Sequence, residues 1–448
     1  MRIAVIGAGI VGVTTAFELA DDGHEVTVYE RRGSVAAETS FANAGVVAPG
    51  YVTPWAAPGM PGKVLRSLWR AHAPVRLGAR LDPATLRWMW RWWRACKPAV
   101  YAANRASMQR LALFSRERLH QITAGLKLEY ERSDGYLVLL RHPTELAMAQ
   151  PGLALLETLG VRHRVLDAAG CLAVEPGLNA DMPLHAGIHL PDDEVGNCRQ
   201  FAHLLRGIAQ ARGVRFRFHT EVERIVPGTQ PQLVIRTASN DESGPLTTTA
   251  DSSRTGFAPT QPMLVDTVTE RADAIVVCAA LGSAALLAPH GLKLPLVPVY
   301  GYSVTAPLRQ HEQHPDRGPR SGVMDERYKV AISRLGSRVR VAGSAELGGS
   351  SIKHNAASLD TLYKVLNDWF PGAARMTQAQ RWKGARPMLP DGPPVLGASG
   401  IAGVWLNLGH GSSGWALACG SARVLADLLA SRTPAVDTAG LGVERLRH

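Results

Sequence analysis

Residues 2–30 read R-I-A-V-I-G-A-G-I-V-G-V-T-T-A-F-E-L-A-D-D-G-H-E-V-T-V-Y-E. The apolar, β-branched run 3–6 is typical of a strand buried on both faces. Residues 13–20 have helical character, and 25–29 predict a second strand that ends directly before Glu30. Between the first strand and the helix stand three glycines in the spacing G-x-G-x-x-G, namely Gly7, Gly9 and Gly12. This order of elements predicts the nucleotide-binding unit of a Rossmann-like domain.

Each part of this unit has a physical role. Gly7 allows the tight turn, Gly9 lets a pyrophosphate approach the backbone, and Gly12 lets the helix pack on the strand. The helix N-terminus offers free N–H groups to the phosphates. Glu30, 18 residues past Gly12, is placed to accept hydrogen bonds from an adenosine ribose. Its charge disfavours the 2′-phosphate of NADP but leaves NAD and FAD open.

Length and glycine placement predict the domain organisation. The chain has 448 residues, 46% of them hydrophobic, which suits two or three domains. Nucleotide-type glycine features occur at both ends, in the first turn and at 409–414, and 237–262 is a polar insertion that we interpret as the tip of a hairpin. We therefore expect a discontinuous cofactor domain with an inserted substrate domain. The cofactor domain would comprise 1–50, 197–290 and 385–448, and the substrate domain 51–196 and 291–384.

Charge and composition limit the partners. The 49 Lys and Arg exceed the 38 Asp and Glu, for a net charge of +11, which could reflect nucleic acid, anionic lipid or an anionic ligand. The excess is mostly Arg spread along the chain, and no RNA-binding motif is present, so no nucleic-acid partner is predicted. The five cysteines are scattered, which favours a reducing, cytoplasmic location. No histidine or cysteine spacing indicates a metal site.

The segment W-M-W-R-W-W-R, residues 88–94, is the one candidate for membrane contact. Tryptophan and arginine suit the interface of a bilayer. Trp88 and Trp92 share a helical face, whereas Trp90 and Trp93 partly face elsewhere. An aromatic seam inside the substrate domain is the favoured interpretation, and a peripheral position on the inner face of the cell membrane stays open.

Several further segments, in order along the chain, carry a family resemblance. They are E-T-S-F-A-N-A-G (38–45), P-W-A-A-P-G (54–59), P-V-Y-G-Y-S (298–303), G-A-R-P-M-L-P-D-G (384–392) and L-N-L-G-H-G-S-S-G-W (406–415). Together they resemble the FAD-dependent D-amino-acid dehydrogenases and, more broadly, the D-amino-acid oxidase and glycine oxidase superfamily. The likeness covers essentially the whole chain.

The resemblance implies fold and activity. It implies a Rossmann-like FAD-binding domain of the glutathione-reductase type, with FAD held non-covalently, and a substrate domain built on a mostly antiparallel sheet. The implied reaction is oxidation of a free D-amino acid, such as D-alanine, to the imino acid and then to 2-oxo acid and ammonia. Electrons would pass to a respiratory acceptor, for which a membrane quinone is the candidate. The sequence leaves the oligomeric state open.

Four residues are predicted to act at the substrate. Arg386, in an R-P motif, resembles the family's carboxylate-binding arginine, and a guanidinium grips a planar carboxylate with two parallel hydrogen bonds. Tyr328 resembles a substrate-binding tyrosine of related oxidases, with Tyr302 as the competitor. His410 lies in the glycine-rich loop, where positioning is favoured over a role as general base, because hydride transfer needs only the neutral amine of the substrate.

The resemblance also implies the residues that would hold FAD. They come from the first turn, the end of the second strand, the loop that follows it, an adenine-side strand, a later turn and the C-terminal loop. They are Ile6, Gly7, Ala8, Gly9, Ile10, Val11, Gly12, Glu30, Arg31, Thr39, Ser40, Asn43, Ala44, Gly45, Val222, Gly282, Gly409, Gly411, Ser412, Ser413 and Gly414.

Three other functions fit parts of the sequence. A related oxidoreductase for glycine, sarcosine or D-hydroxyproline would use the same FAD and the same carboxylate clamp. An NAD-dependent dehydrogenase would explain the first thirty residues but not the loop 409–414. An RNA-associated flavin domain would rest on the net charge alone.

Overall fold

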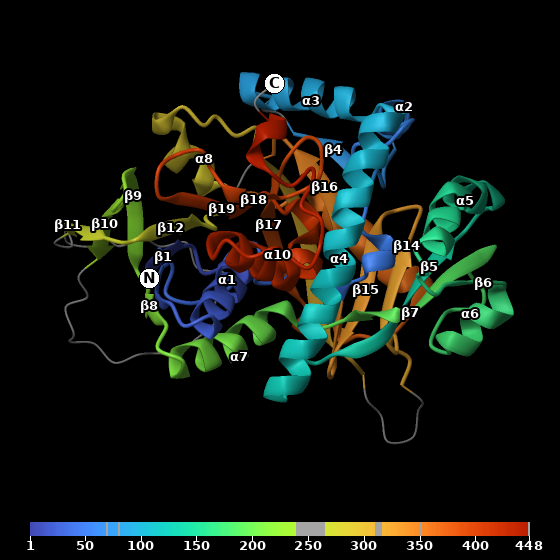
Figure 1. Ribbon diagram of the computed structural model, residues 1–448. Helices are drawn as coiled ribbons and strands as arrows, with labels where there is room; N and C mark the ends of the chain where they lie inside the picture. Colours follow the sequence, from blue (N-terminus) through green and yellow to red (C-terminus); the bar gives the residue numbers. More distant parts are fainter. Residues whose placement is uncertain (69, 79–80, 239–264, 310–315, 350–351, 447–448) are drawn as a thin grey trace.

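The computed structural model describes residues 1–68, 70–78, 81–238, 265–309, 316–349 and 352–446. Its strands form three sheets, and segments far apart in sequence lie side by side within them (Figure 1). The N-terminal β1 and the late strands β18 and β19 share one sheet.

The first sheet is the predicted Rossmann-like sheet, with strand order β18-β19-β12-β1-β2-β8. Its five parallel strands are β1 (Arg2–Ile6), β2 (Glu25–Tyr29), β8 (Arg215–Arg217), β12 (Ala274–Val277) and β19 (Val404–Leu408). The edge strand β18 (Val395–Ala398) is antiparallel. Residues 3–6 of β1 are buried, because a central parallel strand is covered on both faces.

Helices cover one face of this sheet and a smaller sheet covers the other. The helical layer consists of α1 (Ile10–Asp21), α7 (Cys198–Ala211) and α10 (Gly414–Leu429). Opposite lie β9 (Thr220–Val226), β10 (Gln232–Ala238), β11 (Val265–Arg271) and the short helix α8 (Gly282–Leu287). β10 and β11 pair antiparallel, which confirms the hairpin. Residues 239–264, most of its predicted tip, lie outside the described residues.

The second large sheet is mostly antiparallel, with strand order β17-β13-β16-β15-β14-β5-β7-β3. Its strands are β3 (Val46–Val47), β5 (Ser133–Leu140), β7 (Ala186–Val195), β13 (Val297–Pro307), β14 (Gly322–Asp325), β15 (Val330–Leu335), β16 (Arg338–Leu347) and β17 (Gln380–Met388), with β4 (Val75–Leu77) beside β16 and β6 (Arg164–Leu166) beside β7. The predicted fold class is therefore confirmed.

The faces of this sheet have different neighbours. α6 (Ala168–Val174) and α9 (Ala356–Trp369) pack on one face. Residues 44–51, including η1 (Pro49–Tyr51), pack on the other together with α5 (Pro143–Thr158). Two helices at the top of Figure 1, α2 (Met60–Ser67) and α3 (Pro83–Ala95), precede the long α4 (Pro98–Leu126). None of the helices in the described part of the chain combines the length and apolar character needed to cross a bilayer.

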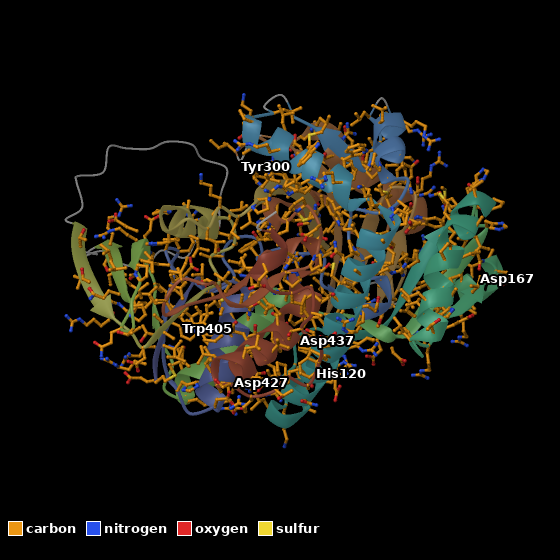
Figure 2. The ribbon with its side chains drawn as sticks, turned by 45° about the horizontal axis from the view of Figure 1, so that its top comes forward. His120, Asp167, Tyr300, Trp405, Asp427 and Asp437 are labelled. Carbon is orange, nitrogen blue, oxygen red and sulfur yellow. The ribbon has the colours of Figure 1, made fainter. Side chains whose placement is uncertain are left out.

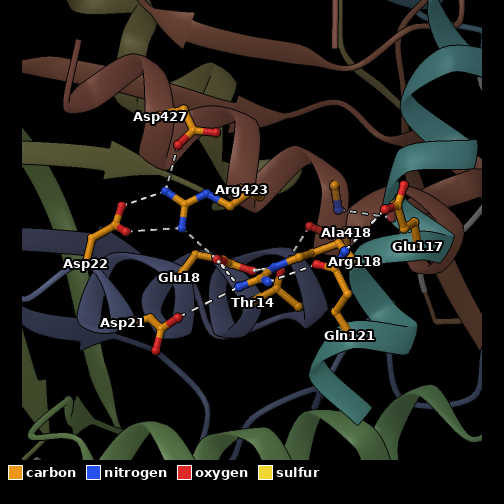
Figure 3. Close-up of polar contacts among 12 residues, drawn as sticks. Thr14, Glu18, Asp21, Asp22, Glu117, Arg118, Gln121, Ala418, Arg423 and Asp427 are labelled. Carbon is orange, nitrogen blue, oxygen red and sulfur yellow. Dashed lines mark hydrogen bonds and ion pairs between the residues drawn. The ribbon is translucent and has the colours of Figure 1, made fainter. Parts of the chain in front are cut away.

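A buried carboxylate of α1 links this helix to α4 and α10 (Figure 3). Glu18 of α1 is fully buried and accepts hydrogen bonds from Arg118 of α4, at 2.7 Å from Nε and 3.0 Å from Nη2. Arg423 of α10 donates to the same carboxylate at 2.9 Å and to Asp22 at 2.6 Å. Because each charge is paired, this cluster fixes α1 against α4 and α10.

Candidate active site

The three glycines of the turn after β1 have two different roles. Two are needed for packing, and one leaves room for a ligand. Gly7 has φ +100°, and a Cβ on Gly12 would lie 1.8 Å from the carbonyl oxygen of Gly7. Gly9 has an ordinary φ of −66°, and a Cβ there would meet nothing closer than the Ser40 hydroxyl at 3.6 Å. Protein packing thus explains Gly7 and Gly12 but not Gly9. The open side of Gly9 fits phosphates that approach the backbone.

Glu30 lies against this turn. One carboxylate oxygen accepts a hydrogen bond from the Ala8 N–H at 2.7 Å, and the other accepts from the Arg32 N–H at 2.8 Å. The carboxylate remains partly accessible. It is therefore held at the end of β2, as a ribose ligand requires.

Arg31 is engaged in a local ion pair. Its Nη2 donates to both oxygens of Glu38, at 2.8 and 2.9 Å, and Arg32 donates to the same carboxylate at 2.7 Å. Burial alone would raise the pKa of Glu38, but the bonds from the two arginines lower it. Arg31 thus lies beside the predicted adenosine site, with its guanidinium bound to protein.

The loop after β2 bridges the two large sheets. Ser40 accepts a hydrogen bond from the Ile10 N–H at the start of α1, at 3.1 Å. The neighbouring Thr39 donates to the carbonyl of Ala385 in β17, at 2.7 Å. These bonds bring the nucleotide turn next to the strand that carries Arg386.

Arg340 of β16, which sequence reasoning missed, anchors the same loop. Its Nη1 donates to the carbonyl of Asn43 at 2.9 Å and its Nε to Thr305 at 2.8 Å, while the Asn43 side chain accepts from the Gly45 N–H at 2.8 Å. Burial lowers the pKa of Arg340 to about 10, and no carboxylate among the described residues forms an ion pair with it. The alternating R-V-R-V of residues 338–341 was the available signal, because it aims alternate arginines at one face of the sheet.

Arg386 lies on β17 as a cation with no acidic partner among the residues that the structure describes. Its Nη1 donates to the carbonyl of Ser344 at 2.8 Å, and the ring of Trp55 lies 5.7 Å from its Cζ. A Cβ on Gly301 would lie 2.4 Å from its Nη2, so the guanidinium crosses β13 over a glycine. Burial lowers the pKa of Arg386 to about 10, and no carboxylate in the described ranges forms an ion pair with it. The arrangement fits a ligand that brings its own carboxylate.

Ser344 shapes this position and was also missed by sequence reasoning. Its φ is +58°, in the left-handed region that a non-glycine residue rarely adopts. It lies where the pairing of β13 with β16 shifts register between Tyr300 and Tyr302, and this bulge turns its carbonyl toward Arg386. Its buried hydroxyl has no hydrogen-bond partner within the described chain.

Two more buried hydroxyls without a partner in the described ranges lie on neighbouring strands, Ser303 on β13 and Ser333 on β15. Each follows a residue of the core beneath α9, Tyr302 or Ile332. Because side chains alternate along a strand, both hydroxyls point to the opposite face, the face of Arg386. Unpaired buried hydroxyls fit a face that is completed by a polar ligand.

Both predicted tyrosines lie away from this face. Tyr302 packs in the core beneath α9; its hydroxyl bonds to Glu346 and accepts from the Asn355 N–H at 3.2 Å. Tyr328, between β14 and β15, packs against the same core, with its ring 5.2 Å from Arg141 Cζ. The structure therefore does not bring either tyrosine together with Arg386.

His410 is buried under the C-terminal loop. Its Nε2 lies 3.0 Å from the Ser421 hydroxyl of α10. Its backbone forms an isolated bridge with Met388, two residues from Arg386. Burial lowers the pKa of His410 to about 3, so the ring is neutral at physiological pH. This geometry agrees with a positioning role.

The loop itself meets the end of β17 at the start of α10. Gly409 and Gly411 have φ of +76° and +54°, and a Cβ on Gly411 would lie 2.7 Å from Met388 Sδ. Ser412 and Ser413 complete the one-turn helix η4 (Gly411–Ser413), and α10 begins at Gly414 with no side-chain cap from the described residues. The uncapped N–H groups suit an oxygen of a ligand between this loop and the sheet.

The remaining predicted residues lie farther along the cofactor side. Val222 sits in β9, paired with Ile235 and buried in the core beside Tyr29. Gly282 starts α8, and its N–H donates to the carbonyl of Ala279 at 2.9 Å. The open side of Gly9 and the held Glu30 fit a bound FAD, whereas the contacts of Val222 and Gly282 with protein do not test their predicted role at the cofactor.

Comparisons with known proteins find relatives that match nearly the whole chain. A protein named D-amino acid dehydrogenase from Cereibacter sphaeroides is 46% identical over 447 residues, which cover 99% of this chain and 95% of that protein. Another of that name, from Bradyrhizobium diazoefficiens, is 41% identical over 450 residues, which cover 100% and 99%. The crystal structure of glycine oxidase from Geobacillus kaustophilus matches with a TM-score of 0.71 at 19% identity, over 100% of this chain and 99% of that one.

The family assignment rests on sequence as well as on fold. The family model described as FAD dependent oxidoreductase matches residues 2–428. The match spans the nucleotide turn, β17 and the loop before α10. An NAD-dependent enzyme would explain the nucleotide turn but not the match over β17 and this loop. The chain belongs to the FAD-dependent oxidoreductase family.

Proposed function

We propose that this protein oxidises free D-amino acids to imino acids, which water hydrolyses to 2-oxo acids and ammonia. The observation that carries the proposal is Arg386, a largely desolvated cation on the ligand-facing side of the sheet with no carboxylate partner in the described residues. The names of relatives at 41–46% identity over nearly the whole chain support the same activity.

In this proposal Arg386 receives the substrate carboxylate. Its Nη1 is oriented by the Ser344 carbonyl and its plane lies near Trp55, so its remaining N–H groups are available for a bidentate pair. The guanidinium stays charged at neutral pH because its pKa of about 10 lies well above that range. Orienting the carboxylate also orients the α-carbon and the amine attached to it.

Bound FAD would supply the redox chemistry by accepting a hydride from the α-carbon. The N–H groups of Gly411 to Gly414 and the N-terminus of α10 would stabilise negative charge on a ligand next to them. The substrate amine loses its proton before the C–H bond breaks, and the carbon–nitrogen double bond of the imino acid then forms. His410 contributes by fixing the loop against α10.

We further propose that the electrons leave for a respiratory acceptor, with a membrane quinone as the candidate. The support is the name dehydrogenase shared by the relatives. A comparison of turnover with a quinone analogue against turnover with dissolved oxygen tests this part separately.

Anaerobic bleaching of the flavin by a panel of substrates tests the activity. D-alanine and other D-amino acids should bleach the bound flavin, their L-enantiomers should not, and Arg386→Leu should require far higher substrate concentrations while the protein stays yellow. Rapid bleaching by glycine, sarcosine or D-hydroxyproline in place of D-alanine would favour the related amine oxidoreductase with the same clamp. A colourless protein would refute the proposal.

A further inference from the structure

Helix α3 has two apolar faces, and within the described part of the chain only one of them packs on other elements. The inner face carries Trp88, which is buried and donates from Nε1 to the carbonyl of Met388 at 2.9 Å. Trp92 lies on the same side, packed against the core that includes Met388 and Val299. This half of the tryptophan cluster is the internal seam that the sequence predicts. Through it α3 packs on the strands near Arg386 (Figure 2, beside the labelled Tyr300).

The outer face carries the other half of the cluster. Leu86, Trp90 and Trp93 follow one another at spacings of four and three, so they share one side of the helix. They are 52%, 53% and 59% exposed. On the neighbouring α2, Leu65 is 64% exposed. A soluble surface seldom gathers so many large apolar side chains in one place without a partner.

The same part of the chain holds most of the net charge. Residues 60–97 contain nine Lys and Arg but only one acid, Asp82, so 40 cations face 37 acids in the rest of the chain. Six of the nine are exposed, namely Lys63, Arg66, Arg70, Arg87, Arg94 and Lys97. None of these six forms an ion pair with a carboxylate of the described chain. The excess of cations is therefore concentrated in this segment, and our expectation that it is spread along the chain is wrong.

We propose that this α2–α3 surface, formed by residues 60–67 and 83–97, docks on an anionic lipid bilayer. α3 would lie in the plane of the interface, with its outer Leu86, Trp90 and Trp93 among the upper acyl chains and its cations at the phosphates. The guanidinium of Arg94 lies 4.8 Å from the Trp90 ring, the pairing that brings both groups to one depth. The proposal rests on the proposed function, because it places the oxidation site next to a lipid-soluble acceptor.

A hollow between the two helices strengthens the choice of a lipid. It has a volume of about 350 Å³, and its walls include Pro61, Trp93, Arg94 and Lys97. Two cations beside an aromatic wall suit a phosphate headgroup attached to an apolar chain. A nucleic acid would bind the cations but would leave Leu86 and Leu65 exposed to water. A second copy of this chain would bring two strongly cationic surfaces together.

Vesicle binding of the FAD-loaded enzyme tests the proposal. Flotation with vesicles of phosphatidylcholine and phosphatidylglycerol is compared with flotation on phosphatidylcholine alone, at low and at high salt. The double variant Trp90→Ser, Trp93→Ser should reduce the fraction bound to anionic vesicles at least about tenfold. Replacing Arg87, Arg94 and Lys97 by Gln should remove the dependence on anionic lipid.

Matched controls separate this result from misfolding and from failure of the proposed function. Met148→Ser removes an equally exposed apolar side chain (59%) on the distant α5 and should leave vesicle binding unchanged. Turnover with a soluble dye acceptor reports the oxidation of D-amino acids without any membrane, and the double tryptophan variant should retain it. Loss of dye turnover in the unmodified enzyme would count against the proposed function, not against docking.

Three outcomes would overturn the docking proposal. The first is equal vesicle binding by the double tryptophan variant and the unmodified enzyme. The second is no binding of the unmodified enzyme to anionic vesicles. The third is a concentration-dependent dimer that the double variant abolishes while vesicle binding is absent, which would assign the surface to a second copy of the chain.

Discussion

Arg386→Leu should make the unliganded protein more stable while it destroys substrate binding. Burial lowers the pKa of Arg386 from its ordinary value to about 10, which corresponds to a cost of about 3 kcal/mol for keeping the cation in the folded protein at neutral pH. Leucine removes that cost and loses the bond to the Ser344 carbonyl, worth about 1 kcal/mol. We therefore expect the free energy of unfolding to rise by about 1–2 kcal/mol.

The sign of the pH dependence follows from the lowered pKa. The cost is fully present below about pH 10 and disappears as pH rises from about 10 toward the ordinary value of arginine, because the folded form then loses its proton first. The stability advantage of the leucine variant should therefore shrink above pH 10. A carboxylate ligand should also remove this cost at neutral pH, because its negative charge compensates the buried cation.

Substrate turnover should move in the opposite direction. Loss of a desolvated bidentate pair costs about 3–4 kcal/mol, or about 10²–10³ in kcat/KM, with most of the change in KM. Urea denaturation of the apoprotein and steady-state kinetics with D-alanine measure both effects. The matched control is Arg381→Leu on the same strand, whose exposed guanidinium bonds to the Tyr363 hydroxyl. A kcat/KM within about threefold of the unmodified enzyme would refute the reasoning, as would a loss of stability like that of a broken ion pair.

Three further predictions concern the cofactor turn, the bulge and the histidine. Gly9→Ala should abolish FAD binding while the apoprotein keeps its denaturation midpoint. Gly12→Ala should prevent folding, because a Cβ at Gly12 would lie 1.8 Å from a protein atom, whereas a Cβ at Gly9 meets none closely. Flavin absorbance measures the first effect and circular dichroism the second. Ser344→Gly should raise the free energy of unfolding by about 1 kcal/mol, because it relieves the positive φ. Ser344→Ala should leave that strain in place and lower kcat/KM for D-alanine by about tenfold or less. A rise in kcat/KM of the alanine variant would contradict the role given to the hydroxyl. His410→Asn should lower the thermal midpoint but leave the shape of the pH–rate profile unchanged between pH 5 and 9, and a lost limb in that range would assign the histidine a proton-transfer role.

The parts of the fold that follow from local chemistry could be predicted from sequence. The first βαβ unit is encoded by its apolar strand, three glycines and terminal acid, and the hairpin of β10 and β11 by its flanking strand residues. Arg386 is predicted as the carboxylate ligand because its R-P motif resembles a family pattern, and this role stays a prediction. Each of these signals lies within one contiguous stretch of sequence, the longest being the hairpin from Gln232 to Arg271.

The rest depends on contacts between distant segments. The face on which Tyr302 lies is set by the register of β13 against β16, and a single-residue shift in a strand exchanges the two faces. Ser344 carries no sequence sign of its positive φ, since the bulge arises only when the two strands pair. The outward turn of Trp90 and Trp93 depends on which side of α3 meets β13, and helical periodicity alone does not choose between two apolar faces.

The titration behaviour of three site groups and of the buried Tyr302 constrains how the substrate loses its proton. The pKa of His410 is lowered to about 3 by burial, and the pKa values of Arg386 and Arg340 are lowered only to about 10. Burial and the bond to Glu346 raise the pKa of the Tyr302 hydroxyl well above its ordinary value. None of these four groups can accept a proton from an ammonium near neutral pH. None of these four side chains is therefore the base that deprotonates the amine in the proposed reaction. They favour the neutral amine because they offer the substrate a cation for its carboxylate and no anion for its nitrogen.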